Sequence, residues 1–300
     1  MKSEPDVGLK ITFDCIPCAI GSLITLFDKG LVPGEKQEPA MRAVLAYFSR
    51  IDYNQTPPQM GKDMHRIIRE VLGDPDPYHE IKMKFNNLML SYYPDLKKIV
   101  AEAGDRLAMA LKLAIAGNII DFGPNQPFDI DKTLNLAKSI VPAIDDTESL
   151  RTDISRAKTI LYLGDNAGEI VLDKLLIETI GHPDVYFAVR GAPVINDATL
   201  EDAKAVGMEE VARVISNGDD APGTILKDTS AEFREIFGRA DLTIAKGHGN
   251  YEGLKGSLGN IYFVLLAKCD YVAGRLGVRK GDFVIKHIQS PPGGEAYVPS

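Results

Sequence analysis

Three short polar segments hold most of the side chains with which this 300-residue chain could do chemistry. They cover residues 164–169 (Gly-Asp-Asn-Ala-Gly-Glu), 190–197 (Arg-Gly-Ala-Pro-Val-Ile-Asn-Asp) and 246–251 (Lys-Gly-His-Gly-Asn-Tyr). Each segment follows a short apolar run that predicts a buried β-strand. Because ligands of an open parallel α/β sheet bind beyond the carboxyl ends of its strands, we expect the three segments to meet at one site.

The first two segments carry oxygen atoms that suit a hard divalent cation. Asp165 and Asn166 stand side by side after one predicted strand and Asp197 follows the next, so all three are candidate ligands of Mg²⁺ or Mn²⁺. These side chains could instead cap the helices that follow them, which is the commoner role for an isolated Gly-Asp-Asn. The two segments taken together favour a metal. Arg190 would point at a substrate oxyanion or pair with one of the carboxylates.

The third segment carries a cation and a flexible backbone that suit a phosphate. Lys246 supplies a point charge, and the glycines on both sides of His248 allow the backbone to approach a ligand closely. His248 could act as an acid, a metal ligand or a hydrogen-bonding spacer. Lys268 ends a further apolar run and is either a second phosphate contact or a solvated lysine. We therefore predict phosphate contacts at Lys246, Gly247, His248, Gly249, Asn250 and Lys268.

The composition is that of a globular protein and argues against several classes of partner. The net charge is −8 and the chain has no basic stripe, so we expect no nucleic-acid partner. No apolar run approaches the length of about 18 residues that a membrane span needs, and the N-terminus lacks a signal-peptide pattern. We therefore expect a cytoplasmic protein with no membrane partner. The oligomeric state is left open, with a homo-oligomer as one alternative.

The first part of the chain predicts a helical domain, assigned to residues 1–150. Apolar residues recur at three- and four-residue spacing, and Pro and Gly pairs interrupt them, including Pro94-Asp95. The expected helices cover residues 18–27, 38–49, 61–72, 76–93, 96–116 and 131–141.

The second part of the chain, residues 151–300, predicts an α/β domain. Short apolar runs alternate with helical patterns, which indicates a mainly parallel, doubly wound, Rossmann-like sheet. The expected strands cover residues 159–163, 184–189, 211–215, 241–245, 261–267 and 282–288. The expected helices cover residues 168–180, 199–206 and 228–238, with a loop or helix at 250–258.

The cysteines do not identify a function by themselves. Three cysteines in a chain of this length do not form a disulfide framework, and Cys15 and Cys18 make a single CxxC. A structural zinc site would need two more ligands at similar spacing. The pair is therefore a helix start with reduced thiols, a redox-sensitive pair or part of a soft-metal site.

The combination of motifs resembles a known family. Residues 164–169, 190–199 (Arg-Gly-x-Pro-x-x-Asn-Asp-Ala-Thr), 246–252 (Lys-Gly-x-Gly-Asn-Tyr-Glu) and 268–270 (Lys-Cys-Asp) are similar, in order, to those of the damage-control phosphatases. That family was once called domain of unknown function 89 and is also called acidic-residue methyltransferase-like. The CxxC, the stretch Asp76-Pro-Tyr-x-x-x-Lys-x-x-x-Asn and Gly117-Asn-Ile-Ile-Asp resemble its stand-alone CxxC-bearing prokaryotic branch.

The resemblance implies a helical domain packed on a Rossmann-like domain that hydrolyses phosphate monoesters of small metabolites. It implies a divalent metal (Mg, Mn, Co or Ni) at the carboxyl edge of the sheet, held by Asp165, Asn166 and Asp197. Residues 246–250 and Lys268 would bind the phosphate. The further sites that we predict are a substrate contact at Asn118 and catalytic roles for Asp165, Asp197 and Lys246.

Two other classes of function are left open. The first is methyl transfer to carboxylates from a sulfonium donor bound by residues 163–168. The second is a non-enzymatic metal- or metabolite-binding module whose CxxC senses redox state. A covalent aspartyl-phosphate at Asp165 is disfavoured, because phosphatases of that kind would need an acid where this chain has Ala167.

Overall fold

The computed structural model of the chain describes residues 7–117, 135 and 137–289. Asn118, together with residues 131–134 and 136 of the helix expected at 131–141, lies outside these ranges. Three helices form a layer with a hydrophobic core of its own. They are α1 (Cys15–Asp28), α2 (Gly34–Phe48) and α3 (Pro57–Leu72). The Thr56 side chain accepts a hydrogen bond from the Gln59 backbone and so caps the start of α3, while Gly73 ends it in the left-handed conformation.

Two further helices pack against the sheet instead: α4 (His79–Glu102) and α5 (Arg106–Gly117). The predicted break at Pro94 is wrong, because α4 continues through it. A proline inside a helix costs about 3 kcal/mol, but Met89, Leu96 and Val100 on this helix are buried in the main core. Within the described ranges, no helix combines the length and the apolar character needed to cross a bilayer.

The sheet has seven strands in the order β1-β7-β6-β5-β2-β3-β4. Neighbouring strands are parallel except β6 and β7, which confirms the predicted mainly parallel, Rossmann-like sheet. The strands are β1 (Ile144–Asp145), β2 (Ile160–Leu163), β3 (Val185–Val189), β4 (Arg213–Ser216), β5 (Leu242–Lys246), β6 (Asn260–Leu266) and β7 (Phe283–Gln289). In the register, Leu163 at the end of β2 lies opposite Ala188 of β3 and Ala245 of β5, so these central strands end together.

Helices cover both faces of the sheet. Alternate residues of a strand point to opposite faces, and on the central strands both sets are apolar and need a cover. Ile160 and Tyr162 belong to the core under α4, α5, α8 and α9, whereas Leu161 and Leu163 belong to the core under α10, α11 and α12. These helices are α8 (Glu169–Ile180), α9 (Leu200–Ala205), α10 (Ala231–Arg239), α11 (His248–Leu254) and α12 (Asp270–Leu276). The remaining elements are α7 (Thr147–Arg156) and two 3-10 turns, η1 (Met208–Glu210) and η2 (Leu226–Asp228). The division at residue 150 stays a prediction, since α4 and α5 share a core with the sheet.

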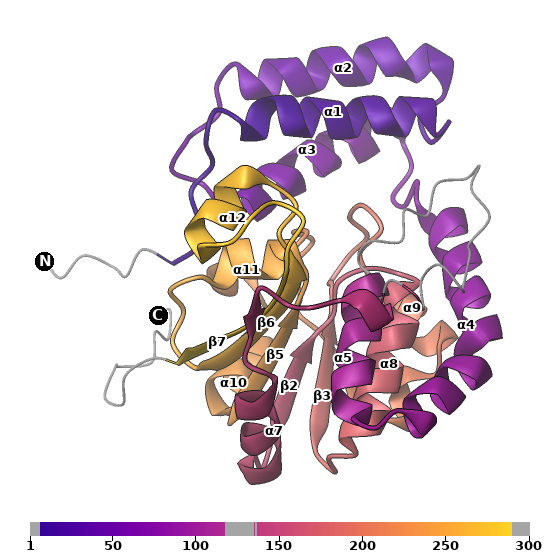
Figure 1. Cartoon of the computed structure of the whole chain (residues 1–300). Helices are drawn as coiled ribbons and strands as arrows, with labels where there is room; N and C mark the ends of the chain where they lie inside the picture. Colours follow the sequence, from indigo (N-terminus) through magenta and orange to yellow (C-terminus); the bar gives the residue numbers. More distant parts are fainter. Residues whose placement is uncertain (1–6, 118–134, 136, 290–300) are drawn as a thin grey trace, which may run out of the picture.

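Figure 1 shows the α1–α3 layer lying across the top of the α/β part, while α4, α5 and α8 stand along one side of the sheet. The loops that follow β3 and β4 contact α3 through side-chain and backbone hydrogen bonds. The carboxyl ends of the central strands are therefore covered by the helical layer.

The burial of His65 in this layer leads to a prediction about the stability of the protein in acid. His65 on α3 is 3% exposed, and burial, helped by the charge of Arg69, lowers its pKa to about 3. The unfolded chain takes up a proton at His65 as the pH falls below about 6.5, whereas the folded chain does not. The stability that depends on a neutral His65 is therefore complete above pH 6.5 and is lost as the pH falls towards 3.

We expect the free energy of unfolding of the wild type to fall faster than that of His65→Gln between pH 6 and pH 4, by up to about 1.4 kcal/mol per pH unit. Urea unfolding at several pH values measures the difference, and the carboxylates common to both proteins cancel. Parallel pH profiles would show that His65 does not control the acid sensitivity.

Candidate functional site

The loops after β2 and β3 are joined directly by their backbones. The Ala167 N–H donates to the Asn196 carbonyl at 2.8 Å, and the Ala198 N–H donates to the Asp165 carbonyl at 2.8 Å. These bonds place Asn166 and Asp197 opposite each other as a two-residue bridge. The first two polar segments therefore meet at the carboxyl edge of the sheet, where parallel neighbouring strands bring them.

The third segment also reaches this point, through the backbone of Gly247. Its φ of +81° is in the left-handed region that favours glycine, and a Cβ there would overlap the Asp165 carboxylate. The chain after β5 therefore packs directly against Asp165. The structure brings the start of all three segments together.

The two aspartates form a buried acidic pair. Asp165 is 8% exposed and Asp197 is 3% exposed. Burial raises the pKa of Asp165, and the neighbouring Glu169 raises it further, against the opposing charges of Lys268 and Arg190. Burial raises the pKa of Asp197 to about 7 although Arg190 opposes it, and Asp165 adds to the rise. Burial thus disfavours the ionised form of both aspartates.

Arg190 pairs with a carboxylate, which was one of its two predicted roles. Its Nε donates to Asp197 Oδ2 at 2.7 Å, and its other nitrogens lie near Asn250 Oδ1, Thr224 Oγ1 and the Gly164 carbonyl. The side chain is 3% exposed. These contacts hold Arg190 within the protein and orient Asp197, so the arrangement gives Arg190 a positioning role.

Asn250 is used in a similar way. It is fully buried, and its amide nitrogen donates to the Lys246 carbonyl at 2.7 Å and to the Gly164 carbonyl at 3.2 Å. Its oxygen accepts a hydrogen bond from Thr224 at 2.8 Å. Asn250 therefore ties the ends of β2 and β5 together, and its predicted phosphate contact stays a prediction.

Lys246 also has its partners inside the protein. Its ammonium is fully buried and donates to Glu169 Oε1 at 2.5 Å, to Asp173 Oδ1 at 2.9 Å and to the Ala114 carbonyl at 3.0 Å. Both acids lie on α8, so the lysine fastens β5 to this helix. Sequence reasoning did not identify Glu169 or Asp173 as its partners.

Lys246 still reaches the acidic pair through a chain of polar contacts. Glu169 Oε2 accepts a hydrogen bond from Asn166 Nδ2 at 3.0 Å, and the same nitrogen donates to Asp165 Oδ2 at 2.9 Å. Lys246 fixes Glu169, and Glu169 fixes Asn166. With its nitrogen held in this way, Asn166 can offer its carbonyl oxygen to a cation.

The exposed cation at the site is Lys268, which follows β6. Its side chain is exposed to solvent, and its charge lowers the pKa of both Asp165 and Asp197. His248 contacts other groups: its Nε2 lies 3.2 Å from Glu252 Oε1, and its Nδ1 lies 3.3 Å from the backbone nitrogen of Lys268. His248 therefore positions the residues around Lys268.

The donor set fits a hard divalent cation that retains several water ligands. Two carboxylates and an amide oxygen are the groups that Mg²⁺ and Mn²⁺ use, and Mg²⁺ commonly keeps waters at its other positions. Among the residues that the structure describes, no three His, Cys, Asp or Glu side chains form a complete metal-binding group. The fit rests on the two aspartates, whose buried charge a cation would neutralise.

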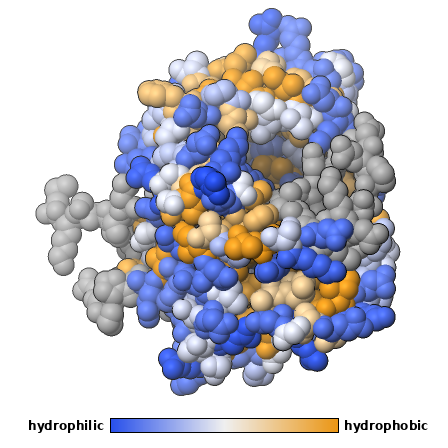
Figure 2. Space-filling model, viewed as in Figure 1, coloured by the Kyte–Doolittle hydropathy of each residue, from blue (hydrophilic) through white to orange (hydrophobic). Residues whose placement is uncertain are grey.

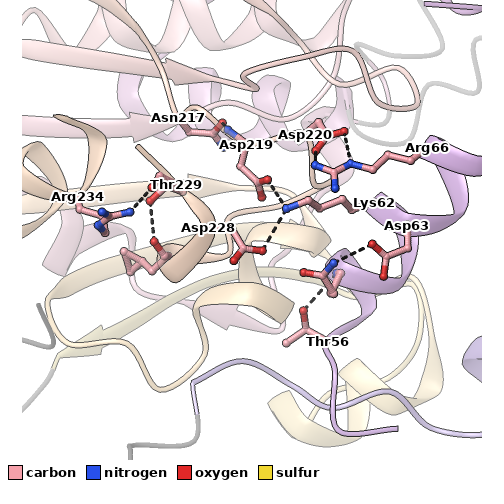
Figure 3. Close-up of polar contacts among 12 residues, drawn as sticks. Thr56, Lys62, Asp63, Arg66, Asn217, Asp219, Asp220, Asp228, Thr229 and Arg234 are labelled. Atoms are coloured by element: carbon pink, nitrogen blue, oxygen red, sulfur yellow. Dashed lines mark hydrogen bonds and ion pairs between the residues drawn. The ribbon is translucent and has the colours of Figure 1, made fainter. Parts of the chain in front are cut away.

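A network of salt bridges fastens the helical layer above this site (Figure 3). Lys62 of α3 lies 2.5 Å from Asp219 and 3.1 Å from Asp228. Arg66 forms a bidentate salt bridge with Asp220, with hydrogen bonds of 2.6 and 2.9 Å. The acids belong to the chain after β4. Sequence reasoning missed this network, because the partners are more than 150 residues apart.

The same helix also holds the loop that carries Asp197. Arg69 donates to Asp220 at 2.6 Å and to the Pro193 carbonyl at 2.5 Å. Two residues later, Ile195 has a φ of +45°, a strained conformation for a β-branched residue, and its side chain packs on the core of the α1–α3 layer. The helical layer therefore helps to fix the backbone from which Asn196 and Asp197 extend.

A second helix, α4, supports the loop after β2. The Gly168 N–H donates to Asn86 Oδ1 at 2.7 Å, and Asn86 Nδ2 donates to Asp202 at 2.8 Å. Lys82 lies 3.2 Å from the same Asp202.

Figure 2 shows the surface hollowed beneath the α1–α3 layer, on the face drawn in Figure 1.

Together, these features define a Rossmann-like α/β protein with a buried acidic site at the carboxyl edge of its sheet and a helical layer above it. A family model described as the damage-control phosphatase ARMT1-like domain matches residues 11–284, so the chain belongs to that family. The family resemblance predicted from the motifs is thereby confirmed.

Curated relatives and a solved structure agree with this membership. The chain is 34% identical to a damage-control phosphatase of Pyrococcus horikoshii, over 92% of this chain and 97% of the relative. It is 35% identical to an uncharacterised protein of Methanocaldococcus jannaschii, over 93% of this chain and 95% of the relative. The crystal structure of a DUF89 family protein from P. horikoshii superimposes with a TM-score of 0.85 at 33% identity, covering 93% of this chain and 99% of that one. The names of the relatives support a phosphatase role for the family in general.

Proposed function

We propose that this chain is a metal-dependent phosphatase that hydrolyses phosphate monoesters of small metabolites at the carboxyl edge of its sheet. The observation that carries the proposal is the pair of buried carboxylates, Asp165 and Asp197, on two loops that are hydrogen-bonded to each other. The exposed ammonium of Lys268 lies within electrostatic reach of both. A cation site beside an exposed lysine is an arrangement that can hold a phosphate ester.

Asp165, Asp197 and the amide oxygen of Asn166 would hold the divalent cation (Mg, Mn, Co or Ni). When bound, such a cation polarises a phosphate oxygen and lowers the pKa of a coordinated water. Lys268 would neutralise charge on the phosphate oxygens, where electrostatic stabilisation of the transition state is largest.

Other residues of the chain prepare these groups. Arg190 keeps Asp197 in one orientation through the 2.7 Å bond to its Oδ2. Lys246 keeps Asn166 in place through Glu169, so we assign Lys246 a positioning role rather than a direct phosphate contact. The Gly247 backbone closes against Asp165, and only glycine fits there.

The proposal is tested by a panel of phosphate monoesters assayed with Mg²⁺, Mn²⁺, Co²⁺ or Ni²⁺ and with a chelator. We expect release of inorganic phosphate from at least one small ester with added metal, and no release in excess chelator. Phosphate release that a chelator does not affect would contradict the metal requirement. Failure to release phosphate from any ester, together with metal-free methyl transfer from a sulfonium donor, would favour the methyltransferase alternative.

A further inference from the structure

Cys15 and Cys18 are far from Cys269 in the sequence, but all three cysteines lie in the same part of the fold. Figure 1 shows α12, which begins after Cys269, below the amino end of α1, which begins at Cys15. The segment before α1 is fastened there, because the Leu9 N–H donates to the Glu252 carbonyl at 2.7 Å. The start of α1 therefore lies near α11 and the start of α12.

Cys269 has the surroundings of a reactive thiol. Its Sγ lies 3.7 Å from His248 Nε2 and accepts a hydrogen bond from the Val272 N–H at 3.5 Å. Glu252 lies 3.2 Å from the same imidazole nitrogen and favours the protonated ring. Burial disfavours the Cys269 thiolate, but the bonds from His248 and Val272 outweigh burial and lower its pKa. Cys269 is partly accessible, and the thiolate that these contacts favour is the form of a cysteine that attacks peroxides.

Cys18 has the complementary surroundings. It is exposed, and burial of part of its side chain raises its pKa, with further increases from Cys15, Cys269 and Glu252. Cys18 therefore lies within electrostatic reach of both of the other cysteines. These surroundings favour the neutral thiol at Cys18, whereas the contacts of Cys269 favour its thiolate.

We propose that Cys269 is a site of oxidation by peroxides and that Cys18 resolves the oxidised form as a Cys18–Cys269 disulfide. In the first step, the Cys269 thiolate attacks a peroxide oxygen; with hydrogen peroxide, the O–O bond breaks, hydroxide leaves, and the sulfur becomes a sulfenic acid. In the second step, the Cys18 sulfur attacks the sulfenic sulfur, and the hydroxyl leaves as water with the proton of the Cys18 thiol. Two electrons pass from the two thiols to the peroxide.

The structure favours this chemistry over the other functions of a CxxC. A soft-metal site would use three or more of these side chains together, and no such group is found among the described residues. A Cys15–Cys18 disulfide would leave the activated Cys269 outside the reaction. Cys15 instead contacts Thr12, whose backbone N–H and hydroxyl lie 3.4 and 3.6 Å from its Sγ.

The disulfide would connect the helical layer to the residue next to Lys268. His248 joins the two regions already, because it contacts Cys269 through Nε2 and the Lys268 backbone through Nδ1. Oxidation would therefore change the surroundings of the exposed lysine, and a thiol reductant would restore them.

The experiment exposes the reduced full-length protein to a small excess of hydrogen peroxide, blocks the remaining thiols and analyses a non-reduced digest by mass spectrometry. We expect a peptide pair linked through Cys18 and Cys269, which disappears on treatment with dithiothreitol. Cys269→Ser should abolish the link, and Cys15→Ser should retain it. None of these measurements requires phosphatase activity, so the result is independent of the proposed function.

A second variant keeps the proposal testable if Cys269→Ser does not fold. Cys18→Ser removes only the resolving thiol, so the oxidised Cys269 should persist and be labelled by dimedone. A Cys15–Cys18 link in the wild type, or Cys269 unlabelled in Cys18→Ser, would overturn the proposal. So would a zinc ion in the purified protein that protects all three thiols from peroxide.

Discussion

Asp165→Asn is expected to reduce phosphate release on the order of 100-fold or more at a fixed concentration of metal. Loss of residues that merely support metal ligands typically costs about 10–100-fold, and Asp165 is proposed as a ligand itself. The substitution keeps the size of the side chain and removes one negative charge from a buried acidic pair. Because that charge is disfavoured by burial and by Glu169, the variant should be at least as stable as the wild type.

Asp197→Asn should cause a similar loss of activity with only a small change in stability. The amide oxygen of the new side chain can accept the 2.7 Å hydrogen bond from Arg190 Nε, and burial already disfavours the charge of Asp197. Phosphate release at increasing metal concentrations, together with chemical unfolding, measures both effects. Asp95→Asn, on the exposed surface of α4, is the matched control and should change neither. If Asp165→Asn retains most of the activity of the wild type at limiting metal, the ligand assignment is wrong.

The acidic pair could be predicted from the sequence because its position depends on topology alone. Asp165 and Asp197 leave strands that alternate with helices along the chain, and such strands commonly become parallel neighbours whose ends coincide. Side-chain direction plays little part, since the loops beyond the strand ends converge as a whole. The backbone bonds between these loops show that this reasoning was sufficient for this part of the site.

The direction of Lys246 could not be predicted from its place at the end of a strand. Leu242 and Ile244 belong to the core under α5 and α8, and the two-residue period of the strand sends Lys246 to the same side. A signal was available in α8, where Glu169 and Asp173 lie one turn apart among apolar residues. Acids on the buried part of a helix require a cation, and the end of β5 supplies it.

The contacts of Arg69 and the course of α4 could not be predicted, because they depend on residues far apart in the sequence. Arg69 meets Pro193 and Asp220 only because α3 lies over the loops after β3 and β4. The continuation of α4 through Pro94 is of the same kind, since burial of its apolar side chains outweighs a local helix breaker. Tertiary packing decides these features, and a single sequence shows only one side of each contact.

Lys246→Met is expected to lower the free energy of unfolding by about 3–5 kcal/mol, the typical cost of removing one partner from a buried ion pair. Glu169 and Asp173 are fully buried and lie 2.5 and 2.9 Å from the ammonium. Burial disfavours the charged lysine, but the two acids outweigh burial and raise its pKa, so the ammonium remains charged in the folded protein. Methionine fills a similar volume without that charge and leaves both buried acids without the cation that they share.

Neutralising the acids as well should restore much of this stability, because the buried charge is removed together with its partner. The comparison is between Lys246→Met and a triple variant that adds Glu169→Gln and Asp173→Asn, measured by urea unfolding with the slope m checked for constancy. The same pair of variants separates the two roles considered for this lysine. A direct phosphate contact would make Lys246→Met lose activity while remaining as stable as the wild type. The positioning role instead requires the loss of stability and its recovery in the triple variant, since the ammonium then acts on the site only through Glu169 and Asn166.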